Sequence, residues 1–322
     1  MTIAVVMATG AFAHGTIKKV RLYKGNEVVA EQEYDEIDSI VFVDVPAGAT
    51  IVDGVLMDGE FSVSTTTKVH FSQGNLQATY NGSAWTWSFA TNQYDYIGDA
   101  AANNAINGNG SVSVNGIVDI FGWSTAATYY GINNSTSDST YSGDFVDWGV
   151  NPISNGGNTA NAWRTLSMEE WKYLFHSRAK ADERCGLGSV NGVNGTILLP
   201  DDWTTVPAGL TFTSVKDMNL PWTENTYNCY CYWVNRNGKN FAQNTYTTQQ
   251  WSAMEAYGAV FLPAAGCRDD VTFVGGVGLY GFYWSSSPYD EIYAYHMNSN
   301  SYYLFPQQKA NRNFGHSVRL VH

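Results

Sequence analysis

Histidine and cysteine, the side chains that most often catalyse reactions or hold metals, are dispersed along this chain. None of the histidines lies beside a Cys or Ser in a nucleophile motif; they are His14, His70, His176, His296, His316 and His322. The cysteines lack the Cys-x-x-Cys spacing of a zinc site; they are Cys185, Cys229, Cys231 and Cys267. The acidic pairs Asp201-Asp202 and Asp269-Asp270 could hold a structural cation, although such carboxylates are more often simply solvated. The sequence predicts no metal, no cofactor and no enzyme. A catalytic triad assembled in space stays open as an alternative.

The chemistry that the residue types favour is binding. Segment 281–321 interleaves Tyr, Asn, Ser, Phe and His, with little charge before Lys309. A core would have to supply buried partners for the Asn and Ser side chains, and a disordered tail would lack the aromatics. Tyr offers rigid contact area at low entropic cost, while Ser and Asn offer adaptable hydrogen bonds, as in antibody binding surfaces. We therefore expect a binding face laid over ordered structure.

Composition limits both the scaffold and the partners. The 322 residues include 11 Trp, 21 Tyr and 31 Gly but only 14% charged residues, which favours a loop-rich β or α+β fold held by aromatic packing. The net charge of −12 argues against binding to nucleic acid or to an anionic membrane, because both need clustered Lys and Arg. No stretch is long and apolar enough to predict a membrane span.

Residues 1–14 are interpreted as the remnant of a signal peptide. The apolar run Ile3–Ala13 closes on Ala-Phe-Ala, as at a cleavage site, although the basic start of a signal is missing. An N-terminal buried strand is the alternative. The sequence therefore predicts an exported protein, secreted or at the cell surface. Residues 15–60 are expected to form a small β-rich module and linker, with paired strands over 17–23 and 28–34.

Residues 61–322 are expected to form the main domain, an α+β unit. Segments 68–77 and 84–89 alternate as strands, and residues 99–147 form a long Gly, Asn, Ser and Thr-rich stretch. One helix is predicted after Ser167, where Glu170 completes a capping box and Trp171 begins the buried stripe. A second is predicted at 249–257, with Thr247 or Thr248 as cap and Gly258 as its end.

Several motifs of this domain resemble a known family. Trp163–Phe175 is similar to the helix motif of the formylglycine-generating-enzyme branch of the C-type-lectin fold, and Gly315–Val321 to its closing strand. Gly281–Ser287 resembles the Gly-x-Tyr-Trp-Ser-Ser strand of bacterial surface proteins in that branch. Segments 155–158, 198–203 and 261–266 also look like members of the group. The resemblance implies a C-type-lectin-like fold over 61–322, with the small β module before it.

In some members of that branch, the C-terminal segment is the variable region of a diversity-generating retroelement, which mutagenises template adenines. An Asn codon altered in this way yields Phe, Tyr, His, Ile, Asp, Ala or Ser, but never Trp, Gln, Glu, Lys or Met. Positions such as Trp284, Met297 and Lys309 would then be scaffold. The resemblance and this sorting predict the ligand-binding residues Phe282, Tyr289, Asp290, Ile292, Tyr293, His296, Tyr302, Tyr303, Phe305, Ala310, Asn313, Phe314 and His316.

The family's other activities do not transfer. Formylglycine generation needs a reactive Cys pair in the C-terminal part of the domain, and no Cys follows Cys267. The Glu-Pro-Asn and Trp-Asn-Asp elements of calcium-dependent lectins are also missing. We therefore expect a monomeric ligand-binding protein that recognises a protein or glycan on another cell, phage or host surface. A carbohydrate-binding lectin is the alternative, and an enzyme with an unrecognised site is the third.

Overall fold

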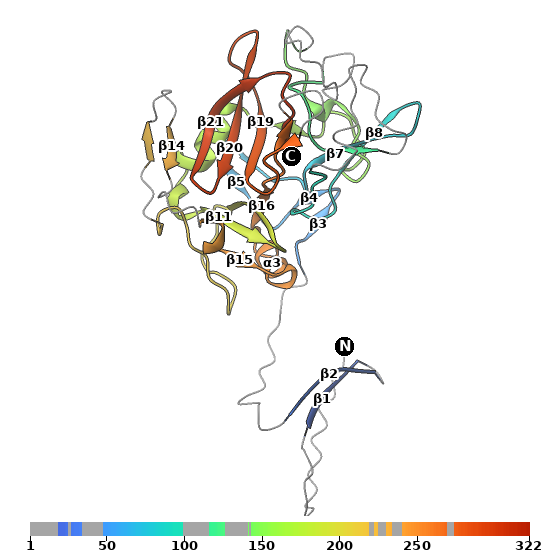
Figure 1. The fold of residues 1–322 in the computed structure, drawn as a ribbon, viewed down its shortest axis with the longest axis vertical. Coiled ribbons are helices and arrows are strands. Elements are labelled where there is room, and N and C mark those ends of the chain that lie inside the picture. The colour runs from blue at the N-terminus through green and yellow to red at the C-terminus, as the bar shows by residue number, and fades with distance from the viewer. Residues whose placement is uncertain are drawn as a thin grey trace, which may run out of the picture. The chain divides into compact units, whose positions relative to one another are not determined.

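The computed structural model describes residues 19–24, 27–33, 48–98, 116–125, 141, 143–218, 222–224, 230–233, 240–268 and 274–322 (Figure 1). The chain divides into two compact units, Met1–Val45 and Pro46–His322. In the first unit β1 (Lys19–Lys24) pairs antiparallel with β2 (Glu27–Glu33), as the alternation of the sequence predicts. The expected signal remnant, residues 1–14, lies outside the described residues. Residues 46–60, assigned above to the first module and its linker, belong to the second unit.

The largest sheet of the second unit is built mainly from the C-terminal segment. Its strand order is β13 (Trp222–Glu224), β14 (Tyr230–Trp233), β21 (Tyr303–Asn311), β20 (Tyr293–Asn300) and β19 (Tyr280–Pro288), all antiparallel. Figure 1 shows β19, β20 and β21 side by side in red, with β14 next to β21. The Tyr- and Asn-rich segment is therefore regular sheet over most of its length.

The remaining strands of the second unit form smaller sheets. A four-stranded sheet has the order β15 (Thr245–Tyr246), β11 (Cys185–Val190), β12 (Val193–Leu198) and β16 (Val260–Pro263). A three-stranded sheet consists of β8 (Trp85–Phe89), β7 (Leu76–Tyr80) and β9 (Ile117–Val118). The short pairs are β3 (Ile51–Val52) with β4 (Val55–Leu56), β5 (Phe61–Ser62) with β6 (Lys68–Val69), β10 (Arg164–Thr165) with β22 (Leu320–Val321), and β17 (Cys267–Arg268) with β18 (Val274–Gly275).

Both predicted helices are present and begin at the expected caps. Helix α2 (Met168–Lys172) starts at Ser167, and the capping box with Glu170 is complete. It continues into a π-helical turn, Tyr173–Ser177. Helix α3 (Thr248–Glu255) starts at Thr247, and Gly258 follows it with the positive φ of 85° that closes a helix without a Cβ clash. Short 3-10 helices cover Trp148–Val150, Ala181–Glu183 and Asn240–Gln243.

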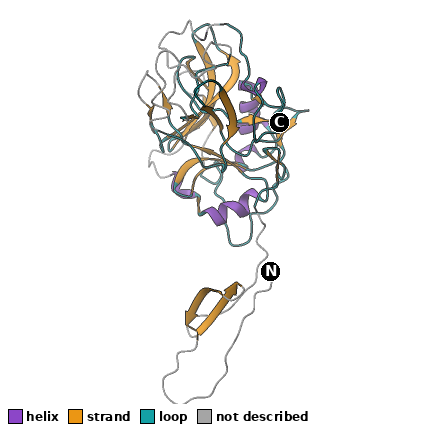
Figure 2. Ribbon diagram, turned by 90° about the vertical axis from the view of Figure 1, so that its right-hand side faces the viewer, coloured by secondary structure: helices purple, strands orange, loops and turns teal. Residues whose placement is uncertain are grey.

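The predicted α+β class is wrong. Strands account for 39% and helices for 13% of the structure, which is β-rich and divided among several small sheets (Figure 2). The capping motifs identify where helices begin, but both α-helices of the described residues end within eight residues and form no layer of their own. The same prediction named a C-type-lectin-like fold. That part is corrected as well, because no known fold is identified for this structure.

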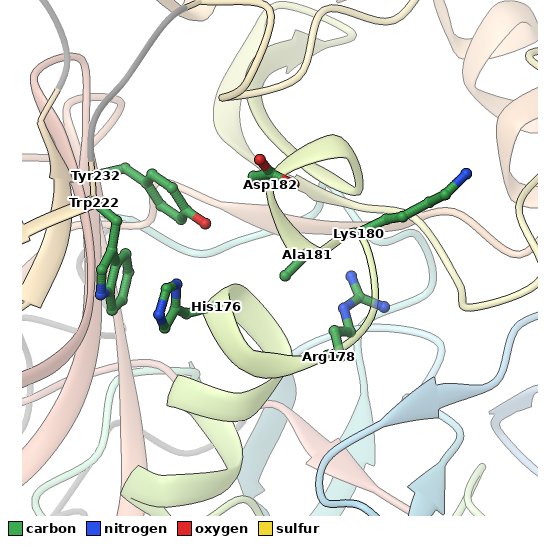
Figure 3. Close-up of a pocket in the computed structure, with 7 residues that line it drawn as sticks. All are labelled: His176, Arg178, Lys180, Ala181, Asp182, Trp222 and Tyr232. Carbon is green, nitrogen blue, oxygen red and sulfur yellow. The ribbon is translucent and has the colours of Figure 1, made fainter.

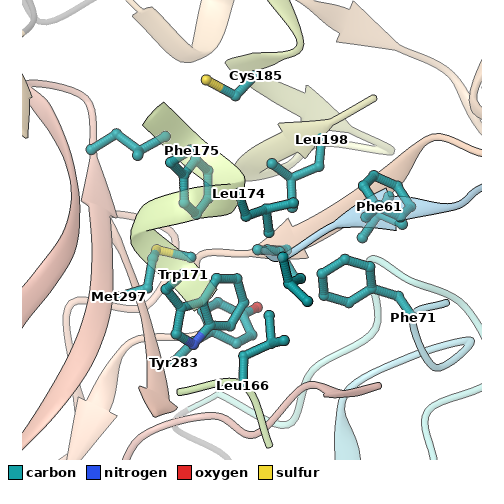
Figure 4. Packing of buried hydrophobic residues seen from close by; sticks show 14 of the residues in the cluster. Phe61, Phe71, Leu166, Trp171, Leu174, Phe175, Cys185, Leu198, Tyr283 and Met297 are labelled. Atoms are coloured by element: carbon teal, nitrogen blue, oxygen red, sulfur yellow. The ribbon is translucent and has the colours of Figure 1, made fainter. Parts of the chain in front are cut away.

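The core is aromatic, and the tryptophans of the motif positions lie within it. Trp163, Trp171 and Trp284 are at most 3% exposed, as expected for scaffold residues. Trp171 packs with Leu166, Leu174 and Phe175 in a cluster that continues through Tyr283 and Met297 of the C-terminal sheet (Figure 4). Trp284 points to the opposite side of β19 and packs with a second cluster that includes Trp123 and Trp148. The C-terminal sheet therefore has buried residues on both faces.

Candidate functional site

The structure does not bring all the predicted binding residues to one surface. Tyr289, Asp290 and Ile292 lie in the exposed turn between β19 and β20, and Tyr293 begins β20. Tyr302 lies at the far end of β20, beyond eight residues that span roughly 25 Å at the usual rise of a strand. His296 and His316 meet in the interior, and the half-buried Phe282 contacts both. Three separate environments therefore replace the single predicted face.

The first environment is an exposed aromatic surface, which we call the tip surface: Tyr289, Ile292, Tyr293, Tyr295 and Lys309. Tyr289 is 48% and Ile292 44% exposed. The Tyr289 ring meets Tyr293 and Tyr295 edge-on at 6.5 and 5.4 Å. The Lys309 ammonium lies 3.8 Å from the centre of the Tyr289 ring, a cation–π contact, and the pKa of Lys309 is raised, first by Tyr289. The aromatic rings are thus held in a defined arrangement while one side stays in solvent.

Hydrogen bonds within the turn fix the backbone of this surface. The Asp290 carboxylate accepts from the amides of Ile292 and Tyr293 at 2.8 and 2.7 Å. These bonds, led by the one from Tyr293, lower the pKa of Asp290. Asp290 therefore shapes the turn, and its carboxylate is already committed to backbone donors.

The buried Arg312 anchors the same turn from its core side. Its backbone amide donates to Ile292 O at 2.9 Å, and its guanidinium donates to Asp290 O and, at 3.4 Å, to Tyr293 O. The same guanidinium donates to Tyr141 O at 3.0 Å and lies 4.3 Å from the Trp123 ring centre. Arg312 is only 3% exposed. This residue connects the exposed turn to the core.

The second environment, which we call the histidine cluster, consists of the buried Trp284, His296 and His316 and the half-buried Phe282. His296 and His316 are 2% and 1% exposed, and their rings lie 4.6 Å apart. His316 packs on Trp284 at 4.2 Å and stacks on Phe282 at 5.0 Å. The expectation that these histidines face a ligand is wrong. The segment after β21 pairs with the edge of β19, where the Trp284 amide donates to Ser317 O, and it carries the His316 ring onto Trp284 and His296.

Burial sets the charge state of both histidines. It lowers the pKa of His296 to about 4, although the carbonyls of Met297 and Lys309 favour the protonated ring. It also lowers the pKa of His316, and there the nearby His296 and the buried Arg268 act in the same direction. Both rings are therefore neutral at pH 7 and act as packing residues.

The remaining predicted residues lie apart from the tip surface. Tyr302 is 45% exposed, Tyr303 is half-buried, and Phe305 is 4% exposed, so Phe305 is also a core residue and not a display position. The Asn300 side chain accepts from the amides of Tyr302 and Tyr303 and shapes that turn. Ala310 and Phe314 pack partly on the second core cluster. Asn313 is half-buried, with its Oδ1 among the buried atoms that have no partner.

Sequence reasoning missed three contributors to the tip surface. Tyr295 follows Tyr293 at the period of two that places side chains on the same face of a strand, so the signal was present. Lys309 was assigned to the scaffold, yet the strand register sets it opposite Tyr295. Arg312 gives no sequence signal, since its role depends on carbonyls contributed by distant segments.

Possible metal ligands and the Cys185 thiol bear on the chemistry open to this protein. No group of three His, Cys, Asp or Glu that could hold a metal occurs among the residues that the structure describes. Burial raises the pKa of the Cys185 thiol to about 12, which leaves it unreactive at neutral pH. Within the same residues, no helix has the length and apolar character to cross a membrane.

Comparison with known proteins identifies no relative. No family model matches the chain, and neither a curated protein nor a solved structure matches it. Function must therefore be argued from the surfaces themselves.

Proposed function

We propose that this protein is an exported, non-catalytic binding protein that recognises a protein partner through the tip surface. The observation that supports the proposal most directly is the exposure of Tyr289 and Ile292 on a turn that is otherwise rigidly held. Large apolar side chains left in solvent at one place commonly mark an interaction site. Tyrosine is also among the residues that most often dominate binding energy at interfaces.

Rigidity of the turn is the second argument. A flexible loop must be ordered on binding, which costs free energy, whereas a preformed loop avoids that cost. Asp290 holds the turn from within, and Arg312 holds it from the core. These contacts give a reason for an exposed aromatic turn to be kept in one conformation. Ordinary surface loops do not need such an anchor.

Diversification of this turn by a retroelement is a part of the same proposal. Tyr289, Ile292 and Tyr293 belong to the amino acids that adenine mutagenesis of an Asn codon can produce, and they lie at exposed or half-exposed positions. Substitutions there would alter the surface and leave the two core clusters intact. The genomic test is a near-identical downstream repeat that differs only at adenines, beside a reverse transcriptase gene. A genome without such a repeat would refute the proposed diversification, but it would not refute the proposed binding role.

The binding test uses matched variants at the two ends of β20. Tyr289→Ser combined with Ile292→Ser removes the apolar part of the tip surface, and Tyr302→Ser is the control at the opposite turn. A surface-protein fraction is captured on each immobilised variant, and the affinity of the captured protein is then measured. We expect the tip variant to lose at least about tenfold in affinity, which corresponds to truncating one interface residue that dominates binding. Equal affinity for wild type and the tip variant, at unchanged thermal midpoint, would reject the proposal.

A further inference from the structure

A depression of about 300 Å³ on the second unit combines two carboxylates with two aromatic rings. Three segments that are distant in sequence form it: the turn after β4, the loop after β12 and the segment after α3. Its volume is at the lower end of the range for small-molecule sites. Among the described residues, no Lys, Arg or His lines it. The side chains on which the argument rests are Asp58, Asp202, Trp203, Thr204, Thr205 and Tyr257.

Neither carboxylate forms an ion pair with a side chain of the described ranges. Asp58 Oδ2 accepts from the backbone amide of Thr50, and no group in this part of the chain donates to the other oxygen. Asp202 is exposed, and the described residues supply no donor to its carboxylate. Glu60 chiefly, and Asp202 weakly, raise the pKa of Lys68, whose ammonium pairs with Glu60 at 3.1 Å. The depression therefore offers negative charge and open acceptors to a cation.

The two rings form the apolar side of the depression. Trp203 and Tyr257 meet edge-on, with ring centres 6.2 Å apart and planes at 66°. Trp203 is half-buried and packs against the buried cluster that contains Trp251. Tyr257 is 47% exposed. One ring is thus anchored in the core while the other stands in solvent, and the face of an aromatic ring attracts a cation.

Close backbone contact brings Asp58 to the end of α3. A Cβ on Gly59 would lie 2.5 Å from Gly258 O, and a Cβ on Gly258 would lie 2.5 Å from Asp58 O, so both positions need glycine. Tyr257 immediately precedes this contact, which places its ring and the Asp58 carboxylate in the same depression. The C-terminal end of a helix also carries partial negative charge, which adds to the attraction for a cation.

A second depression of similar size, about 310 Å³, has a different balance of charge. Its aromatic side is closed on itself, because the rings of His176 and Trp222 stack with centres 4.1 Å apart. Its one carboxylate, Asp182, is accompanied by Arg178 and Lys180 (Figure 3). That lining has a net positive charge, so it does not favour a cation as the first depression does.

The acceptors of the first depression favour a planar cation with several donors. A quaternary ammonium has no N–H group and would leave the carboxylates and the hydroxyls of Thr204 and Thr205 without a hydrogen bond. The ammonium of a lysine is a compact point charge that does not stack on a ring. A guanidinium has five N–H donors in one plane, pairs with a carboxylate at two points and stacks on an aromatic face. It matches both sides of the depression.

We propose that this depression binds the guanidinium group of an arginine side chain in a peptide or protein segment. The guanidinium stacks on the exposed Tyr257 ring and donates to the carboxylates of Asp58 and Asp202. Free arginine fits less well, because its own α-carboxylate would lie near both Asp carboxylates. This site is separate from the tip surface and does not rest on the binding role proposed for that surface.

The test titrates the full chain with N-acetyl-L-arginine amide at constant ionic strength and measures affinity by ligand-observed NMR. N-acetyl-L-citrulline amide has nearly the same shape without the charge and should bind at least about tenfold more weakly. Free L-arginine and tetramethylammonium should also bind more weakly than the arginine amide. Binding of citrulline amide or tetramethylammonium as tight as that of arginine amide would overturn the proposal. Equal binding of free L-arginine would overturn its peptide source.

Two variants place the binding in this depression. Asp202→Asn should weaken binding of the arginine amide about tenfold, because it replaces a charge-assisted hydrogen bond by a neutral one. Tyr257→Ala should weaken it several-fold by removing the ring. A chain with a net charge of −12 attracts every cation weakly, so matched controls are needed. Glu169→Gln removes the same charge from an exposed side chain of α2, and Tyr302→Ala removes another exposed ring.

The outcomes separate a defined site from general attraction. An equal loss of affinity in Asp202→Asn and Glu169→Gln, or in Tyr257→Ala and Tyr302→Ala, would overturn the proposal. The thermal midpoint of each variant reports folding, and Asp202→Asn carries the test if Tyr257→Ala unfolds, since Asp202 is exposed. The double variant Tyr289→Ser with Ile292→Ser should bind the arginine amide as wild type does. Failure of this proposal is therefore distinguishable from failure of the proposed function.

Discussion

Acidification below pH 6.5 should destabilise this protein through the histidine cluster. His296 is 2% exposed, with a pKa lowered from 6.5 to about 4, and His316 beside it is shifted in the same direction. The unfolded chain binds a proton on each ring near pH 6.5, whereas the folded protein resists that proton. The stability contributed by the neutral rings is therefore complete above pH 6.5 and falls as the pH drops toward 4.

The size of the stability loss caused by His296 follows from the lowering of its pKa. A difference of about 2.5 pKa units corresponds to about 3 kcal/mol between the ends of the window, and about 2 kcal/mol of it is lost by pH 5. Protonation of His316 should lower the free energy of unfolding in the same direction. A proton on the His316 ring would also face Arg268 and the imidazole of His296, which makes it harder still to add. The ring contacts with Phe282 and Trp284 offer no counter-charge.

The assay is urea unfolding at intervals from pH 7.5 to 5.0, for wild type, His296→Phe and the control His322→Gln. His296→Phe keeps a ring of similar size but cannot take up a proton, so its stability should fall less steeply with decreasing pH. His322 is exposed, and its replacement should leave the slope of wild type unchanged. An identical slope in wild type and His296→Phe would refute the reasoning. So would an NMR titration in which the His296 ring protonates near pH 6.5 in the folded protein.

Three further outcomes follow from the packing and the turn. Trp284→Ala should lower the free energy of unfolding by about 3–5 kcal/mol in chemical denaturation, because it opens a cavity in the core. It also leaves Phe121 O without the hydrogen bond that the indole donates at 2.7 Å. Ser167→Ala should cost about 1 kcal/mol in the same experiment by removing the cap of α2; a cost near zero would contradict the capping geometry. Arg312→Lys should speed hydrogen exchange at the amides of Ile292 and Tyr293 at least several-fold and weaken partner binding, and unchanged exchange would show that the turn needs no anchor.

Local sequence chemistry determined the short-range features of this protein. Ser167 with Glu170 and Thr247 with Gln250 satisfy the free amides of a first helical turn by themselves, so both helix starts were predictable. The hairpin of β1 and β2 followed from alternation, and burial of Trp171 followed from its place on an apolar stripe. Tyr289 and Tyr302, two of the thirteen residues predicted to bind a ligand, are exposed.

Only the tertiary structure decided which residues of that segment face solvent. A strand places alternate side chains on opposite faces, but the sequence does not say which face another segment will cover. Ser317 pairs with the edge of β19 and His316 with Phe121, and this pairing places the His316 ring against His296 and Trp284, where both histidines are buried. The fold class failed for a related reason, since a capping box fixes where a helix begins and not how far packing lets it continue. The contacts of Arg312 and the stacking of His176 on Trp222 depend on segments distant in sequence, so no local pattern could have predicted them.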